Sequence, residues 1–102
     1  MTYLFFYLTL VILLSSCSRE LQYSSNPVFP GWYADPEGII AGREYWIFPT
    51  YSAPYDKQVF LDAFSSKDLV NWTKHDRIID TSSVKWLNRA MWAPSVIDNN
   101  GR

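Results

Sequence analysis

The sequence "REYWIFPTY", Arg43 to Tyr51, decides the fold class, because aromatic and β-branched residues fill it. The turn signal "AGR" precedes this stretch. Pro49 interrupts it, as is usual in an edge strand or near the end of a strand. The pattern predicts a β-strand over residues 43–51.

Neighbouring segments repeat the strand pattern. The segment "QVFLDAFSS", Gln58 to Ser66, alternates in a way that predicts a strand partly buried on both faces. A polar "SKDL" turn follows, with a 3₁₀ turn at residues 69–72 as an alternative. Further strands are predicted at "HDRII", residues 75–79, and at "MWAPSVID", residues 91–98. We therefore expect an all-β fold of short antiparallel strands.

The last residues, "NNGR", carry the hairpin turn signal Asn100-Gly101. A four-stranded propeller blade takes roughly 40 to 50 residues, so residues 27–102 would supply a first blade and the start of a second, incomplete as a propeller. A small open β domain is the alternative. We favour the N-terminal part of a larger protein, because an unfinished hairpin leaves an unpaired strand edge.

The first residues have the pattern of a signal peptide. An uncharged apolar run, residues 3–14, is too short to span a membrane, and "LSSC" follows it, ending in the single cysteine, Cys17. This resembles a bacterial lipobox and implies removal of residues 1–16, a lipidated tether over 17–26, and export to the periplasm or outer membrane. A plain secretory signal or an apolar core strand remain alternatives.

Composition excludes several classes of function. The chain has 102 residues, a formal net charge of -1, and 18% aromatic residues, so it is neither disordered nor suited to nucleic acid. It contains no Gly-rich phosphate loop, no nucleophile elbow and no cluster of metal ligands, so we expect no cofactor and no metal. With one cysteine, no disulfide can form within the chain.

One carboxylate stands out in "PGWYADPEGII", residues 30–40. Asp35 lies between aromatic residues and Pro36, which biases the preceding residue towards extended geometry. The simplest interpretation is an Asp-Pro turn whose side chain bonds its own backbone. The other hypothesis is a carboxylate held at a strand end to act on a substrate.

Three segments together favour the second hypothesis. The stretches "NPVFPGWYADPEGI", "FSSKDLVNWTKH" and "MWAPSVI" resemble, in order and spacing, the start of glycoside hydrolase family 43 enzymes. That resemblance covers residues 26–102 and implies a five-bladed β-propeller with its active site in the central channel. It also implies that Asp35 is the general base of an inverting glycosidase.

The resemblance implies further site residues. The aromatic of the "WAP" motif maps onto Trp92, which would line the sugar site, and Trp32 and Tyr51 are further candidates, because aromatic rings cover the apolar faces of sugars. The general acid and the aspartate that tunes its pKa have no match in this chain. Glu37 is a poor substitute, because two acids on one strand point the same way and cannot straddle a sugar.

Other polar residues are expected on the surface. They comprise His75 and the acids Asp56, Asp62, Asp68, Asp76, Asp80 and Asp98, which we interpret as turn or solvent-facing residues.

Together with the signal pattern, the resemblance thus implies a lipid-anchored glycosidase that acts on plant polysaccharides such as arabinan, arabinoxylan or xylan, with α-L-arabinofuranosidase, arabinanase or β-xylosidase activity. A non-catalytic carbohydrate-binding lipoprotein and an inert truncated fragment are the alternatives.

Overall fold

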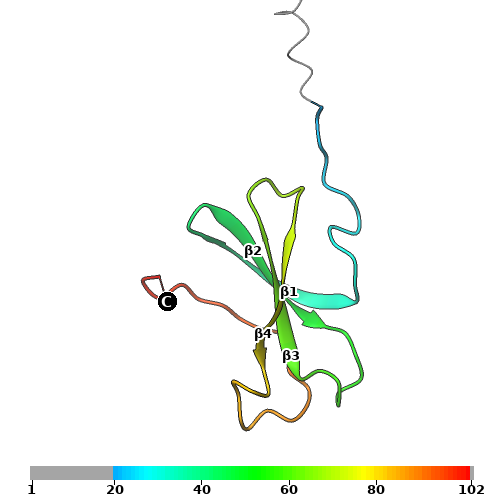
Figure 1. Cartoon of the computed structure of the whole chain (residues 1–102), viewed down its shortest axis with the longest axis vertical. Coiled ribbons are helices and arrows are strands. Elements are labelled where there is room, and N and C mark those ends of the chain that lie inside the picture. The colour runs from blue at the N-terminus through cyan, green and yellow to red at the C-terminus, as the bar shows by residue number, and fades with distance from the viewer. Residues whose placement is uncertain (1–19, 102) are drawn as a thin grey trace, which may run out of the picture.

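The computed structural model describes residues 20–101, which form one open antiparallel sheet (Figure 1). Its strands are β1 (Tyr33–Ala41), β2 (Glu44–Tyr51), β3 (Phe60–Ser66) and β4 (Thr73–Asp80), and they lie side by side in chain order. A four-stranded meander of this kind is the arrangement of a propeller blade, so the all-β prediction is confirmed.

Within the described residues, no helix is long and apolar enough to cross a membrane. Residues 1–16 and Cys17 lie outside the described range.

Three of the predicted strands form, with small differences. The stretches 43–51, 58–66 and 75–79 correspond to β2, β3 and β4. Pro49 lies two residues before the end of β2 at Tyr51, so of its two expected positions, an edge strand or a strand end, the second is confirmed. The alternative 3₁₀ turn at residues 69–72 was wrong: the chain bends there, with Leu69 at a φ of 64°.

The strand predicted over residues 91–98 was wrong. No strand is assigned between Asp80 and residue 101, and the segment follows the end of the sheet as an irregular connection. Its backbone groups bond to a loop and a side chain instead of a neighbouring strand. Asn100 and Gly101 do adopt left-handed φ angles of 53° and 77°, as a type I′ hairpin turn requires.

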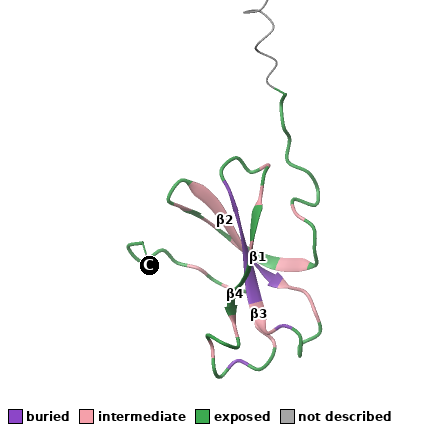
Figure 2. Ribbon diagram, viewed as in Figure 1, coloured by how far each residue is buried: buried purple, intermediate pink, exposed green. Residues whose placement is uncertain are grey.

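Both faces of the sheet carry apolar side chains, as the pattern of β3 predicted. From Leu61 to its end, β3 is buried along its whole length (Figure 2). On one face the ring of Phe29 stacks on Phe64 at 3.8 Å between centroids. On the other face the ring of Trp46 stacks on His75 at 4.8 Å. Burial on both faces is what a sheet sandwiched between other layers requires.

His75 was expected on the surface, and this prediction was wrong. Its Nε2 is 2.9 Å from the hydroxyl of Ser65, and its ring is half-buried under Trp46. Its strand pairs it with Ala63, whose side chain is fully buried. The reason is that His75 lies in the edge strand beside the buried strand β3, and the ring of Trp46 reaches from β2 across β3 to stack on it.

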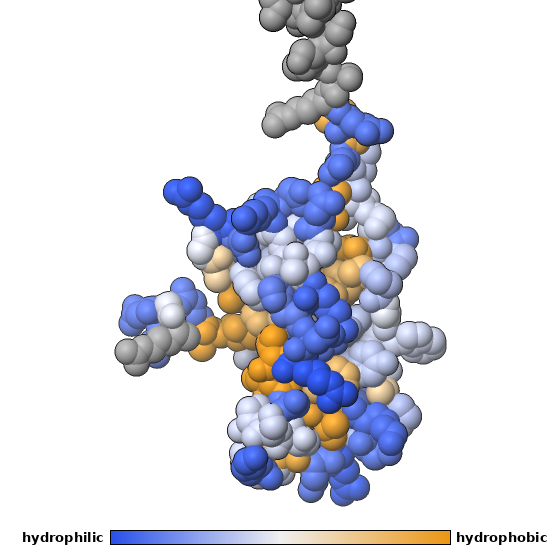
Figure 3. All heavy atoms as spheres, viewed as in Figure 1, coloured by the Kyte–Doolittle hydropathy of each residue, from blue (hydrophilic) through white to orange (hydrophobic). Residues whose placement is uncertain are grey.

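Some apolar side chains remain uncovered. Ile40 on β1 and Ile78 and Ile79 on β4 are exposed. Figure 3 shows hydrophobic residues, in orange, next to hydrophilic ones, in blue, on the face turned toward the viewer. The outer strands of the sheet therefore present apolar surface alongside charge.

Candidate active site

The antiparallel order brings three separate segments to one end of the sheet. Tyr33 at the start of β1 pairs with Tyr51 at the end of β2, and Phe60 at the start of β3 pairs with Asp80 at the end of β4. The rings of Tyr51 and Phe60 lie 5.2 Å apart, which connects the two halves. The approach to β1, the β2–β3 loop and the segment after β4 therefore all begin or end here.

Asp35 lies at this end on a β-bulge. Ala34 pairs with Thr50 and Glu37 pairs with Phe48, so Asp35 and Pro36 together oppose Pro49 alone. Neither proline has an N–H to donate to the ladder, so regular pairing cannot continue through this point. The additional residue is accommodated by a bend, and bulges of this kind re-aim side chains next to active sites.

The expected extended geometry of Asp35 was wrong. Its φ is 46°, in the left-handed region that Asp tolerates better than most residues. The bulge imposes this angle, and it outweighs the bias that Pro36 exerts on the preceding residue. The bulge also interrupts the alternation that would have placed Asp35 and Glu37 on one face.

The carboxylate of Asp35 is exposed to solvent. Within residues 20–101, no hydrogen bond or ion pair engages it, including the bond to its own backbone that an Asp-Pro turn would make. The side chain is therefore free to act on a molecule from outside this part of the chain.

The "WAP" segment is fastened to the same end of the sheet by three backbone N–H groups. Ala90 donates to the carbonyl of Tyr55 at 3.0 Å, and Met91 donates to the carbonyl of Gln58 at 2.8 Å. Ala93 donates to the hydroxyl of Thr50 at 2.7 Å. Since Thr50 is the partner of Ala34 in the ladder, the segment lies beside the residue that precedes Asp35.

The aromatic candidates take different positions at this end. Trp92 is half exposed, and its ring lies 5.7 Å from that of Tyr55 at an angle of 42°. Trp32 is 78% exposed, while its carbonyl accepts the N–H of Ser52 at 2.7 Å. Tyr51 is half-buried among rings. Trp92 and Trp32 thus offer open ring faces, and Tyr51 lines a hollow described next.

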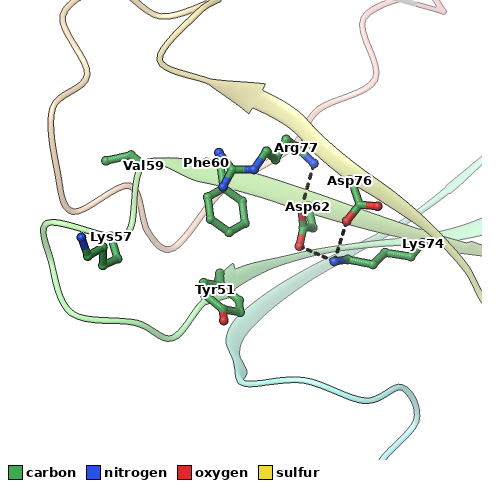
Figure 4. A pocket seen from close by; sticks show the side chains of 8 residues that line it. All are labelled: Tyr51, Lys57, Val59, Phe60, Asp62, Lys74, Asp76 and Arg77. Atoms are coloured by element: carbon green, nitrogen blue, oxygen red, sulfur yellow. Dashed lines mark hydrogen bonds and ion pairs between the residues drawn. The ribbon is translucent and has the colours of Figure 1, made fainter.

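A hollow of about 470 Å³ is lined by residues of β3, β4, the end of β2 and the β2–β3 loop (Figure 4). Asp62 lies in its wall and is 2% exposed. Its Oδ1 accepts the backbone N–H of Arg77 at 2.8 Å, and its Oδ2 accepts the hydroxyl of Tyr33 at 2.8 Å. The ammonium of Lys74 is 3.1 Å from Oδ2 and 2.6 Å from Asp76. We call Tyr33, Asp62, Lys74 and Arg77 the Asp62 cluster.

The interpretation of Asp62 as a turn or solvent-facing acid was therefore wrong. Burial raises the pKa of Asp62, but the Arg77 N–H, the Tyr33 hydroxyl and the Lys74 ammonium outweigh burial and hold this pKa below its ordinary value. A signal existed in the sequence, because Asp62 alternates with Phe60 and Phe64 on the inner face of a strand. A carboxylate at a core position needs partners, and those partners lie on other strands.

The described residues hold no group of three or more His, Cys, Asp or Glu side chains placed to bind a metal ion. What the end of the sheet does offer is an open carboxylate, exposed aromatic rings and backbone groups fixed by hydrogen bonds.

Comparison with known proteins identifies the class. Residues 24–102 match the family model of Glycosyl hydrolases family 43. The chain belongs to this family, as the three segments of the sequence indicated. A curated relative is the β-D-galactofuranosidase xynD of Aspergillus niger, which is 60% identical over 74 residues. The match covers 72% of this chain and 22% of the relative, so the chain spans about a fifth of the length of that protein.

Proposed function

We propose that this chain forms the first blade of a glycosidase that hydrolyses O-glycosidic bonds, with Asp35 as its general base. The observation that carries the proposal is the bulge, which presents an unpaired carboxylate at the end of the sheet where Trp92 and Trp32 expose their rings. Membership of the family supports the reaction class.

The chemistry assigned to Asp35 is proton abstraction from water. As the water oxygen bonds to the anomeric carbon, the carboxylate takes the water proton, and the bond from that carbon to the leaving oxygen breaks. A carboxylic acid on the opposite side of the sugar donates a proton to the leaving oxygen. In inverting enzymes the two groups stand roughly 6.5 to 9.5 Å apart, so the acid must come from another part of the protein.

A furanoside is the substrate class that we favour. The relative is named for β-D-galactofuranose, and the family resemblance includes α-L-arabinofuranosides. The two sugars share the configuration of their five-membered ring and differ in the side chain at C4. A site that accommodates one ring is therefore suited to the other, whereas a β-D-xyloside presents a different shape.

The test uses the complete polypeptide that carries these residues, with aryl α-L-arabinofuranoside, β-D-galactofuranoside and β-D-xyloside. We expect turnover of a furanoside and a loss of about 10²-fold or more in kcat for Asp35→Asn. Asp56→Asn is the matched control, because it removes an exposed carboxylate paired with Lys57 at 3.5 Å. Near-normal turnover by Asp35→Asn would exclude Asp35 as the base. Sugar binding without any turnover would favour the carbohydrate-binding alternative.

Lipid anchoring through Cys17 is part of the proposal. The sequence pattern supports it, because an uncharged apolar run over residues 3–14 is followed by "LSSC", which ends in Cys17. Labelling of bacteria that express the complete gene with a radioactive fatty acid tests the anchor. Incorporation that Cys17→Ala abolishes is expected, and unchanged incorporation would exclude Cys17.

A further inference from the structure

A single hydrogen bond connects the strand that carries Asp35 to the most buried strand. Tyr33 opens β1, two residues before Asp35, and its hydroxyl donates to Oδ2 of Asp62 on β3 at 2.8 Å. Because β2 lies between these strands, the bond reaches past a neighbouring strand. The start of β1 is thus fixed by a side chain as well as by its ladder.

The ring of Tyr33 is held in place by its neighbours. It makes edge contacts with Phe29, Tyr51 and Phe64, with centroid distances of 5.7, 5.6 and 5.1 Å. Such edge-to-face pairs are a favourable geometry for aromatic rings. Since the ring is fixed on several sides, its hydroxyl has a defined position over the carboxylate of Asp62.

The acceptor is fixed equally well. Asp62 is buried, bonds the N–H of Arg77 through its other oxygen, and pairs with Lys74. Burial raises the pKa of Asp62, and its three partners more than compensate, so the group stays ionised at neutral pH. An ionised acceptor strengthens the hydrogen bond from Tyr33.

The bulge itself has few restraints of its own. Pro36 and Pro49 face each other across it, and neither can donate a ladder bond. The direction of the Asp35 side chain therefore depends on the residues that flank the bulge. On the N-terminal side, that residue is Ala34, which follows the anchored Tyr33.

We propose that Tyr33 and Asp62 are positioning residues that hold the bulge so that the Asp35 carboxylate points at the attacking water. This inference rests on the proposed function of Asp35. Tyr33 sets the position of the Asp35 carboxylate and transfers no proton itself. Removal of its hydroxyl should therefore slow turnover only in a protein that still has Asp35.

The test measures kcat and KM of the complete polypeptide on a 2,4-dinitrophenyl furanoside. The activated leaving group keeps the residual rate of Asp35→Asn measurable. We expect Tyr33→Phe to lower kcat about tenfold with little change in KM, because a misplacement of about 1 Å costs about 10²-fold and the loss of one hydrogen bond should shift the carboxylate by less. Tyr45→Phe is the matched control, since within residues 20–101 the half-buried Tyr45 has no side-chain hydrogen bond.

The decisive comparison places Tyr33→Phe in the Asp35→Asn background. If the Tyr33 hydroxyl acts through Asp35, its removal does not lower kcat further in the Asp35→Asn background. An equal fall in both backgrounds would show a merely structural role and overturn the inference. Unchanged kcat for Tyr33→Phe, with Asp35→Asn inactive, would overturn the inference and leave the proposed function standing. Full activity of Asp35→Asn would overturn both.

Discussion

Thr50 and Ala93, 43 residues apart in the chain, are joined by one hydrogen bond of 2.7 Å from the backbone N–H to the threonine hydroxyl. Thr50 is 2% exposed and is the ladder partner of Ala34. One buried side chain therefore fastens the segment that carries Trp92 beside the bulge that carries Asp35. The two motifs meet at the site through β2.

Thr50→Val tests this connection. The substitution keeps the shape of the side chain but leaves the Ala93 N–H without its acceptor, which should lower the free energy of unfolding by about 1 to 3 kcal/mol. Urea unfolding of the complete polypeptide measures the loss, and hydrogen exchange should show faster exchange of the Ala93 amide. Thr73→Val, at the exposed start of β4, is the control and should change little. Equal protection of the Ala93 amide in both variants would contradict the role of Thr50.

Asp62→Asn should destabilise the protein at neutral pH. The amide keeps the shape of the side chain but loses the negative charge that pairs with Lys74 and accepts the Tyr33 hydroxyl. The free energy of unfolding should fall by about 1.5 to 3 kcal/mol, the range for hydrogen bonds to charged groups. Asp76→Asn removes the exposed partner of the same lysine, and it should cost much less, because surface pairs contribute little. Urea unfolding at pH 7 distinguishes the two.

The pH dependence of the same variant has a defined sign. The pKa of Asp62 is lower in the folded protein than in the unfolded chain, so its contribution is complete above the unfolded pKa of about 3.9. That contribution is lost as the pH falls through the folded pKa. The stability difference between Asp62→Asn and the unaltered protein should therefore be constant above about pH 5 and shrink below about pH 4. A difference that grows on acidification would contradict the ionised state of Asp62.

Gly31→Ala should disturb Tyr33. Gly31 has a φ of 127°, and a Cβ on it would overlap the ring of Tyr33. Gly42→Ala is the matched control, because Gly42 also has a positive φ, 65°, but nothing lies within 4 Å of its Cβ position. The control should carry only the backbone strain of about 1 to 2 kcal/mol, and Gly31→Ala should carry more. Thermal unfolding compares them, and equal losses would show that the ring of Tyr33 yields freely.

The strands of this fold follow from local pattern, and the site follows only in part. Residues 43–51 and 58–66 carry alternation and β-branched or aromatic side chains, which suffices to predict β2 and β3. The stretch 91–98 carries similar residues but forms no strand: the N–H groups of Met91 and Ala93 bond to the carbonyl of Gln58 and the hydroxyl of Thr50 instead of a neighbouring strand. Strand formation requires a partner, and local pattern does not specify one.

The conformation of Asp35 and the burial of Asp62 depend on residues distant in the sequence. The bulge arises because Pro36 faces Pro49 across two strands, a register that neither proline reveals alone. Asp62 is buried because Tyr33, Lys74 and Arg77 converge on it from β1 and β4. Sequence reasoning from single segments therefore identified Asp35 as a candidate but missed both its backbone geometry and the cluster that flanks it.

Trp92→Ala should weaken substrate binding in the complete polypeptide. The ring of Trp92 is 55% exposed and is braced by Tyr55 at 5.7 Å, so it can cover the apolar face of a sugar without first being ordered. Loss of about 1.4 kcal/mol of such contact corresponds to a tenfold rise in KM. Trp86→Ala is the control, since Trp86 is 83% exposed and, within residues 20–101, pairs with no other ring. If both variants raise KM equally, exposure alone explains the effect and Trp92 is not a sugar-binding residue. A rise in KM for Trp92→Ala alone would assign sugar binding to the ring that the hydrogen bond from Ala93 to Thr50 fastens to this end of the sheet.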